Sequence, residues 1–279
     1  SKADPDQRPP TTWSETENVV WKADVPGRGH GTPVLWGPNI FLPTADEDKE
    51  IQYLLCYDRA TGQKRWQTVI HQGGFMHMHP KNSHASSTAA CDGTYVSIPF
   101  MVQDAIWLTA VDFEGKIAWQ EKLSPFKSKH GFAVSPFIYR SLLIVPCDNP
   151  GPSCLVAVHR HSGEVVYRVP RTDYQNFSSP LVAHVCGREQ LLIPGPYRVK
   201  SYDPATGGEL WSCEGPTDVA ASTMAAGDEL VYATAGYPEK NLLCIRADGR
   251  GDVTDSHLVW EMEGNAAYVP TPLLHEGLL

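Results

Sequence analysis

The chain has 279 residues, with 23 lysine and arginine residues against 32 aspartate and glutamate residues, so its formal net charge is −9. This negative balance argues against a protein that binds nucleic acid or anionic membranes by charge. Hydrophobic residues make up 42% of the chain and charged residues 20%, which is typical of a globular protein. The longest apolar runs, such as 142–145, are too short to span a bilayer, so we expect no transmembrane segment.

Turn-forming residues are frequent. The 23 glycines and 23 prolines together make up about 16% of the chain, against a usual ~12%. Short strands joined by many turns have this composition, so we expect an all-β protein.

One phrase recurs along the chain at a spacing of 44 to 53 residues. Its fullest copies begin Asp-x-Ala-Thr-Gly, and in four copies an aromatic residue follows the glycine by four positions. These pairs are Gly62 and Trp66, Gly115 and Trp119, Gly163 and Tyr167, and Gly207 and Trp211. A fifth copy, at Gly249, reaches Trp260 only after an insertion, and Trp21 is a sixth aromatic without an upstream phrase.

A second series, of hydroxyl residues that open each apolar segment, keeps step with the first. Thr32, Ser135, Ser179 and Thr271 each precede a proline, and Thr88 and Thr223 occupy the equivalent places. Two interlocked series in constant phase indicate an internal structural repeat.

Each repeat predicts four short strands, which in the third copy cover 133–138, 142–146, 154–158 and 164–169. The middle strands are continuously apolar, so both of their faces need cover. Four antiparallel strands repeating about every 45 residues predict a β-propeller. A β-sandwich is the alternative, but it would not keep the recurring phrase at the same position in every repeat. We expect a single domain over 1–279, with blades at about 32–70, 86–123, 133–170, 177–213 and 220–263 and partial strands at 19–25 and 269–279.

The phrase itself predicts a tight hairpin turn. Its aspartate can accept hydrogen bonds from backbone N–H groups downstream, and its glycine supplies a positive φ. The aromatic residue then lies on the outermost strand, where its flat face can pack on the neighbouring blade. We expect this structural docking role for Trp66, Trp119, Tyr167, Trp211 and Trp260.

The segments CYDRATGQKRWQ (56–67) and SYDPATGGELWS (201–212) resemble the tryptophan-docking repeat of the pyrroloquinoline-quinone-like, or PQQ-like, propellers. Residues 79–88 and 246–254 are similar to loops of a secreted bacterial branch of that family. The resemblance covers nearly the whole chain. It implies an eight-bladed family truncated here to about five to six blades, and a periplasmic or extracellular protein.

In PQQ-like propellers, the loops that lead from an outer strand to the next blade's innermost strand line one mouth of the channel, where function resides. Five of the eleven histidines lie in three of these loops. We therefore expect a polar depression at this mouth. The candidate binding residues are Arg28, His30, His77, His79, Lys81, Asn82, His84, His130, Tyr174 and Tyr268.

Two cofactor hypotheses concern these loops. His77, His79 and His84 could present three imidazoles to zinc or copper, but no aspartate or glutamate accompanies them, so we expect no metal. The resemblance to quinoprotein dehydrogenases implies PQQ with calcium and the oxidation of an alcohol or a sugar. The adjacent cysteine pair of alcohol-oxidising members is absent, whereas His84 or His130 could be the base of a sugar-oxidising one.

The preferred function is a non-catalytic scaffold with a protein partner and no cofactor, similar in kind to the lipoprotein propeller of the outer-membrane protein assembly machine. A PQQ-dependent alcohol or sugar dehydrogenase is the alternative, and a polysaccharide-binding module is the second alternative. The sequence has no Gly-x-Ser-x-Gly, His-Glu-x-x-His or P-loop motif that would favour a hydrolase or a nucleotide-binding enzyme.

Seven cysteines are an odd number and too dilute for a disulfide scaffold. Cys147 and Cys154 flank a predicted hairpin loop. They could form a disulfide across it or remain two buried free thiols.

Overall fold

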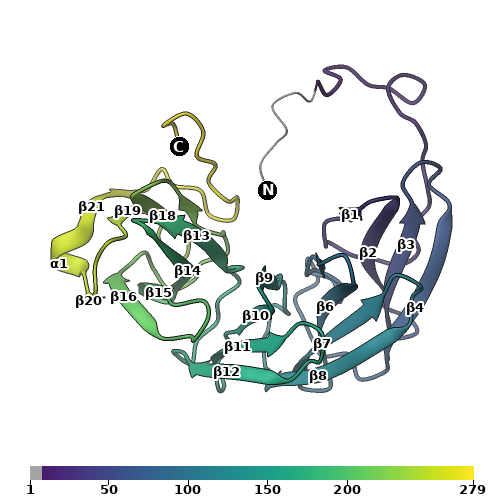
Figure 1. Ribbon diagram of the computed structural model, residues 1–279, viewed down its shortest axis with the longest axis horizontal. Coiled ribbons are helices and arrows are strands. Elements are labelled where there is room, and N and C mark those ends of the chain that lie inside the picture. The colour runs from purple at the N-terminus through teal and green to yellow at the C-terminus, as the bar shows by residue number, and fades with distance from the viewer. Residues whose placement is uncertain (1–7) are drawn as a thin grey trace.

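A computed structural model describes residues 8–279 as an open arc of five antiparallel β-sheets, which follow one another in chain order (Figure 1). Each blade is a four-stranded meander whose first strand is innermost and whose last strand lies on the outside of the arc, and the sheet of the fourth blade gains a fifth, parallel strand, β20 (Gly251–Asp252). The all-β propeller of four-stranded blades predicted from the repeat is confirmed. The continuously apolar middle strands are central in every blade, and in blades 2, 3 and 4 a neighbouring blade covers each of their two faces.

The blades have the following strands. Blade 1 contains β1 (Val34–Trp36), β2 (Asn39–Asp46), β3 (Ile51–Asp58) and β4 (Lys64–Gln72). Blade 2 contains β5 (Ala90–Cys91), β6 (Tyr95–Val102), β7 (Ala105–Asp112) and β8 (Ile117–Pro125). Blade 3 contains β9 (Phe137–Tyr139), β10 (Leu142–Cys147), β11 (Cys154–His159) and β12 (Val165–Pro170).

Blade 4 contains β13 (Leu181–Val185), β14 (Arg188–Gly195), β15 (Arg198–Tyr202) and β16 (Glu209–Glu214). Blade 5 contains β17 (Ala225–Ala226), β18 (Leu230–Ala235), β19 (Asn241–Arg246) and β21 (Leu258–Glu263). The insertion before Trp260 forms β20 (Gly251–Asp252), which pairs in parallel with β16, and the short helix α1 (Thr254–His257). Within residues 8–279, no helix has the length and apolarity needed to cross a membrane.

The partial strands expected at 19–25 and 269–279 do not form. Residues 19–25 have no strand pairing, and the second segment contains only an isolated bridge between His275 and Leu278. A strand needs the backbone groups of a neighbour to complete its hydrogen bonds, and neither segment has such a neighbour in the described part of the chain. Trp21 nevertheless docks on blade 1, where its Nε1 donates to the Arg59 carbonyl at 2.9 Å.

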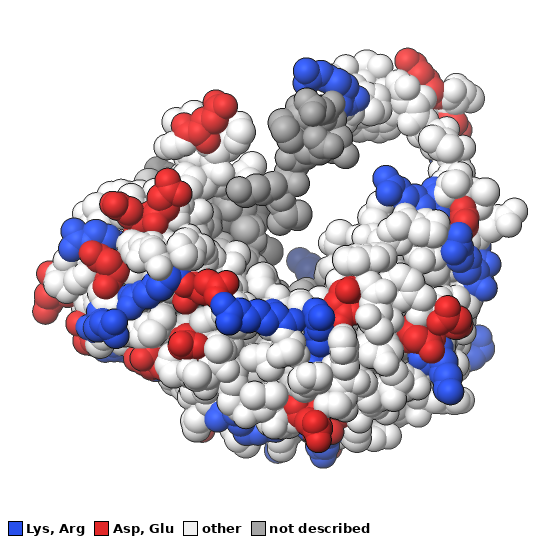
Figure 2. Space-filling model, viewed as in Figure 1, with Lys and Arg blue, Asp and Glu red and all other residues white. Residues whose placement is uncertain are grey.

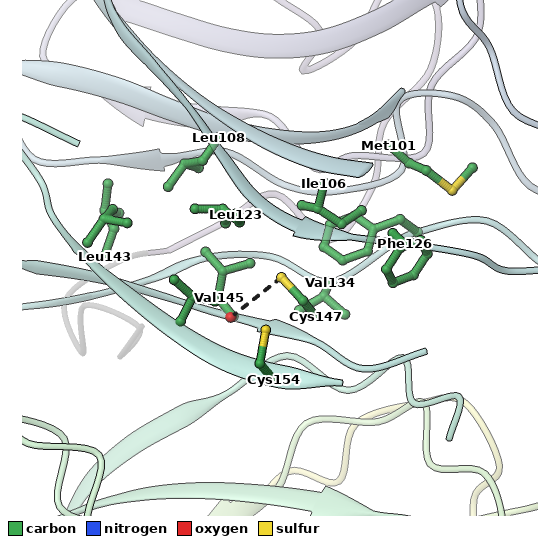
Figure 3. Packing of buried hydrophobic residues seen from close by; sticks show 13 residues of the cluster. Met101, Ile106, Leu108, Leu123, Phe126, Val134, Leu143, Val145, Cys147 and Cys154 are labelled. Atoms are coloured by element: carbon green, nitrogen blue, oxygen red, sulfur yellow. Dashed lines mark hydrogen bonds between the residues drawn. The ribbon is translucent and has the colours of Figure 1, made fainter. Parts of the chain in front are cut away.

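Apolar clusters between successive blades make up the core. Figure 3 shows the cluster between blades 2 and 3, where Leu108 and Leu123 face Leu143 and Val145. Equivalent clusters lie between the other neighbouring blades, and their aliphatic side chains are removed from water almost completely. The hydrophobic effect therefore stabilises blade-to-blade contact, and no blade has a separate core.

The aromatic residues of the repeat lie on the glycine turns of the following blades. Trp66 Nε1 donates to the Phe113 carbonyl at 2.8 Å, and Trp119 Nε1 donates to the Arg160 carbonyl at 3.2 Å. A Cβ atom at Gly115 would lie only 2.9 Å from the Trp66 ring, and this glycine also has a φ of +87°. This position therefore requires glycine for two reasons: the positive φ of the turn and the close approach of the indole ring.

Trp211 reaches the next blade indirectly. Its Nε1 donates to Gln190 Oε1 at 2.7 Å, and Gln190 Nε2 donates to the Ala247 carbonyl at 2.8 Å. The Gln190 amide thus joins the indole to the turn of blade 5. Trp260, by contrast, is 41% exposed, and no blade follows it in the described chain, so its docking stays a prediction.

The hydroxyl series forms hydrogen bonds from blade to blade. The backbone N–H groups of Thr32, Thr88 and Ser135 each donate to the side-chain hydroxyl of the next residue in the hydroxyl series, at 2.9, 3.0 and 2.9 Å. The accepting hydroxyl groups belong to Thr88, Ser135 and Ser179, respectively. Thr223 donates to Thr271 in the same way at 3.2 Å. The second series of the sequence thus marks contacts between the inner segments of neighbouring blades.

Replacing Trp211 by alanine is expected to reduce the free energy of unfolding by about 3–5 kcal/mol, because it removes a fully buried indole. Chemical denaturation of both proteins measures the loss. Trp260→Ala is the matched control, since its half-exposed ring gives a smaller loss. Equal losses in the two variants would contradict the docking role of Trp211.

Ser135→Ala removes the acceptor for the Thr88 N–H and is expected to destabilise the protein by about 1–2 kcal/mol. The control is Ser162→Ala, because Ser162 lies in an exposed turn. Denaturation midpoints compare the two. A Ser135→Ala midpoint equal to that of the parent would show that the hydroxyl series does not contribute to blade association.

Candidate functional site

A groove of about 940 Å³ lies where the ends of all five blades meet. We call it the mouth groove. Its residues come from the loops that follow β4, β8, β12, β16 and β21, and from the β10–β11 and β18–β19 hairpins. They are Asn82, Lys129, His130, Ala133, Pro150, Tyr174, Gln175, Phe177, Val219, Ala221, Tyr237, Tyr268 and Val269.

Four of the residues predicted from the sequence line this groove: Asn82, His130, Tyr174 and Tyr268. Asn82 Nδ2 donates to the His130 carbonyl at 2.7 Å, which ties the loop of blade 1 to that of blade 2. The His79 ring stacks on the His130 ring with centroids 5.6 Å apart. Asn82, His79 and His130 thus form one connected wall.

The other candidates lie elsewhere. His84 stacks on Phe75 with ring centroids 3.8 Å apart, and its Nδ1 is buried with no hydrogen-bond partner. His30 Nδ1 lies 3.3 Å from Ser86 Oγ, and His77 lines a separate depression of about 500 Å³. Arg28 donates to the Pro80 carbonyl at 2.8 Å, so it fastens the same loop from blade 1.

The shared depression expected for His30, Asn82, His84, His130 and Tyr174 therefore contains three of the five. The long loop that follows β4 folds back on blade 1, where Gln52 Nε2 donates to the His84 carbonyl at 2.9 Å. Lys81 does not line the groove; its backbone N–H donates to His79 Nδ1 at 3.2 Å.

The three histidines of the imidazole hypothesis do not lie together. His77, His79 and His84 have different neighbours: a separate depression, His130 and Phe75. Among residues 8–279, no three or more His, Cys, Asp or Glu side chains come together in an arrangement that could hold a metal ion.

The aromatic character of the groove was only partly predicted. Phe177 and Tyr237 line it together with Tyr174 and Tyr268, and the three tyrosines are 38–57% exposed. Tyr237 belongs to the β18–β19 hairpin. In a meander, the hairpin between the second and third strands lies at the same end as the loop to the next blade, so strand order alone would have placed it here.

Polar groups hold the groove walls in place. Arg171 binds Asp148 through two hydrogen bonds, of 2.7 and 2.9 Å, and Asn176 Nδ2 donates to the same carboxylate at 3.0 Å. Both members of the ion pair are at most 5% exposed. A buried, bidentate pair of this kind fixes its two loops, here the hairpin that carries Pro150 and the loop that carries Tyr174.

One acidic group lies beside the groove. The Tyr174 hydroxyl donates to Asp218 Oδ2 at 3.3 Å, and Asp218 Oδ1 is buried with no hydrogen-bond partner. Burial and the Asp218 charge both raise the pKa of the Tyr174 phenol. The tyrosine therefore stays protonated and can present its ring to a ligand while its hydroxyl is held.

The family model described as "Outer membrane protein assembly factor BamB" matches residues 11–129 and 52–279. A search of curated proteins gives no match. Among solved structures, BamB from Moraxella catarrhalis has a TM-score of 0.58 at 11% identity. The comparison covers 90% of this chain and 69% of the BamB chain.

Two solved dehydrogenases also share the fold. The quinohemoprotein alcohol dehydrogenase from Comamonas testosteroni has a TM-score of 0.61 at 14% identity, and one from Pseudomonas putida HK5 has a TM-score of 0.57 at 16% identity. Each comparison covers 86% of this chain and 54% of the dehydrogenase. This chain thus spans about half of their length, and the likeness concerns the fold alone.

His71, near the end of β4, packs edge-on against the neighbouring aromatic rings of Phe100 and Trp107. Its Nε2 is buried and has no hydrogen-bond partner. Burial lowers the pKa of His71 to about 4. Protonation would leave a charge in an apolar contact between blades 1 and 2.

The folded-state pKa of His71 lies below the unfolded value of 6.5, so the unfolded chain binds a proton first as the pH falls. The stabilising effect of the neutral ring is complete above pH 6.5 and is lost toward pH 4. In His71→Gln, we expect the loss of unfolding free energy between pH 6.5 and pH 4 to be smaller than in the parent by about 2–3 kcal/mol. Urea denaturation between pH 8 and pH 4 measures it, and parallel profiles for both proteins would contradict the assignment.

Proposed function

Because this chain belongs to the PQQ-like propeller family described as outer membrane protein assembly factor BamB, we propose that it is a non-catalytic scaffold that binds an extended segment of a protein partner in the mouth groove. The observation that carries the proposal is the groove itself. It has about 940 Å³ of space and is lined by four aromatic side chains. A BamB-like role also favours a periplasmic or extracellular location.

Aromatic side chains are suited to protein recognition. Tyr174, Tyr237 and Tyr268 each offer a large ring with few rotatable bonds to a partner, at low cost in conformational entropy. Phe177 supplies a purely apolar surface between them, and its ring meets the edge of His130 at a centroid distance of 6.0 Å. An aromatic or aliphatic side chain of the partner would thus find apolar rings to contact, with polar lining groups beside them.

The charges in and around the groove do not favour a strongly charged partner. Lys129 is the one charged residue among those that line the groove. On the face seen in Figure 2, acidic and basic side chains are interspersed, and neither sign forms a continuous patch. Long-range attraction of a polyanion therefore has little support, and the apolar contacts dominate the proposed binding.

PQQ with calcium is the competing proposal, since two structural neighbours are quinohemoprotein dehydrogenases. Calcium prefers six to eight oxygen ligands with carboxylates among them. None of the residues that line the groove is aspartate or glutamate, so they do not fit such an ion. A polysaccharide could stack sugar rings on the same tyrosines, and this second alternative is an outcome of the test below.

Peptides selected from a random display library against the full chain are expected to be rich in aromatic and aliphatic residues. Replacing Phe177 and Tyr268 together by alanine should weaken their binding about tenfold or more, because both rings line the groove. Isothermal titration measures the affinities. Tyr197→Ala is the matched control, since Tyr197 is 59% exposed and does not line the groove.

Other ligands separate the alternatives. Stoichiometric binding of PQQ with calcium, followed by dye reduction with an alcohol or sugar, would overturn the scaffold role in favour of a dehydrogenase. Polysaccharide binding lost in the same double variant would favour the sugar-binding module. Selected peptides that bind the double variant and the parent equally would remove the groove from the proposal.

A further inference from the structure

Cys147 and Cys154 lie directly opposite one another, as the last strand pair before the loop of the β10–β11 hairpin. Directly opposed residues of antiparallel strands have Cα atoms about 4.5–5.5 Å apart. That separation lies inside the range in which a disulfide forms without backbone movement. Both cysteines are free thiols, and Figure 3 shows them side by side at one edge of the cluster between blades 2 and 3.

The two thiols differ in access. Cys147 is completely buried among apolar residues, 3.9 Å from the Val145 carbonyl. Cys154 is 6% exposed, and its side chain lines an open cavity of about 510 Å³. A reagent in this cavity can therefore meet Cys154 first, with Cys147 directly behind it.

A cation and a hydroxyl lie directly beside the Cys154 sulfur. Arg168 Nη1 lies 3.3 Å from the Cys154 sulfur, and Ser124 Oγ lies 3.6 Å from it. The guanidinium is held there because the same Nη1 donates to the Leu123 carbonyl. A cation and a hydroxyl beside a sulfur atom stabilise the thiolate, which is the nucleophilic form.

The ionisation of the pair follows from these contacts. The hydrogen bond with Cys147, together with Ser124 and Arg168, lowers the pKa of the Cys154 thiol to about 6, against the effect of burial. The same hydrogen bond, burial and the nearby Asp148 charge raise the pKa of Cys147. At Cys56 and Cys213 burial is the largest influence, and the pKa of each thiol is raised to about 11.

We propose that Cys154 and Cys147 form a thiol–disulfide exchange site, in which Cys154 attacks a small anionic disulfide compound and Cys147 resolves the product. The cavity is lined by Arg168 and Lys122, and none of its other lining residues is charged. Two cations in an open cavity favour a substrate that carries carboxylates. This proposal does not depend on ligand binding in the mouth groove.

The electrons and atoms balance in two steps. The Cys154 thiolate attacks one sulfur of the disulfide RS–SR, which forms a mixed disulfide Cys154–S–S–R and releases one thiolate RS⁻. Cys147 then loses its proton to solvent and attacks the Cys154 sulfur, which forms the Cys147–Cys154 disulfide and releases the second RS⁻. The protein dithiol is oxidised by two electrons and the compound is reduced to two thiols.

The test uses the reduced full chain and glutathione disulfide at pH 7, followed by alkylation of the remaining thiols and peptide mass spectrometry. We expect one disulfide, between Cys147 and Cys154, with the other cysteines alkylated. Cys147→Ser should instead accumulate glutathione on Cys154. Cys91 and Cys186 are internal controls, because both are more exposed than Cys154 and should react more slowly.

Arg168→Gln should slow the reaction about five- to tenfold at pH 7, and the rise of its rate with pH should move toward the range of an ordinary thiol. Cystamine, a cationic disulfide, should react more slowly than glutathione disulfide with the parent protein. Circular dichroism confirms that each variant is folded, and Cys147→Ala replaces Cys147→Ser if the serine variant is not. Modification of Cys186 before Cys154, or equal rates in Arg168→Gln and the parent, would overturn the proposal.

Discussion

The contact between an aromatic ring of one blade and a glycine turn of the next sets the geometry of the whole arc. A positive φ and the absence of a Cβ allow Gly62, Gly115 and Gly163 to receive Trp21, Trp66 and Trp119 at van der Waals distance. Each indole also donates to a carbonyl of that turn. Apolar packing and a directional hydrogen bond thus act at one place. Because the contact repeats in the same phase, every loop between blades reaches the same end of the molecule.

The contact tolerates variation when another group replaces the missing part. At blade 5 the insertion that forms β20 and α1 displaces the turn, and Gln190 connects Trp211 to Ala247. Arg188 Nη2 donates to the Ala247 and Gly249 carbonyls at 3.0 and 2.7 Å, which holds the displaced turn from blade 4. The same physical requirement, a partner for the indole N–H and for the turn carbonyls, is met by side chains of β14. A buried indole N–H without such a partner would be costly.

The sequence predicts those features that depend on local phase and misses those that depend on how a long loop folds. Gly115 and Trp119 show their roles in sequence because a turn and a strand lie four residues apart. Asn82 and Tyr174 could be assigned to one mouth because strand order fixes the ends of their loops. His84 could not, since its place against Phe75 follows from packing within the long loop that follows β4. Tyr237 was missed because only one of the two kinds of loop at that end was considered.

The β10–β11 hairpin connects two cavities that have different chemistry. Its loop contributes Pro150 to the mouth groove, and Cys154, the first strand residue after that loop, lines the smaller basic cavity. Between them, the carboxylate of Asp148 is held by Arg171 and Asn176. Because a buried bidentate ion pair resists displacement of its loop, a change of thiol state at Cys154 need not move Pro150. The same hairpin can therefore carry a binding surface and a reactive dithiol that act independently.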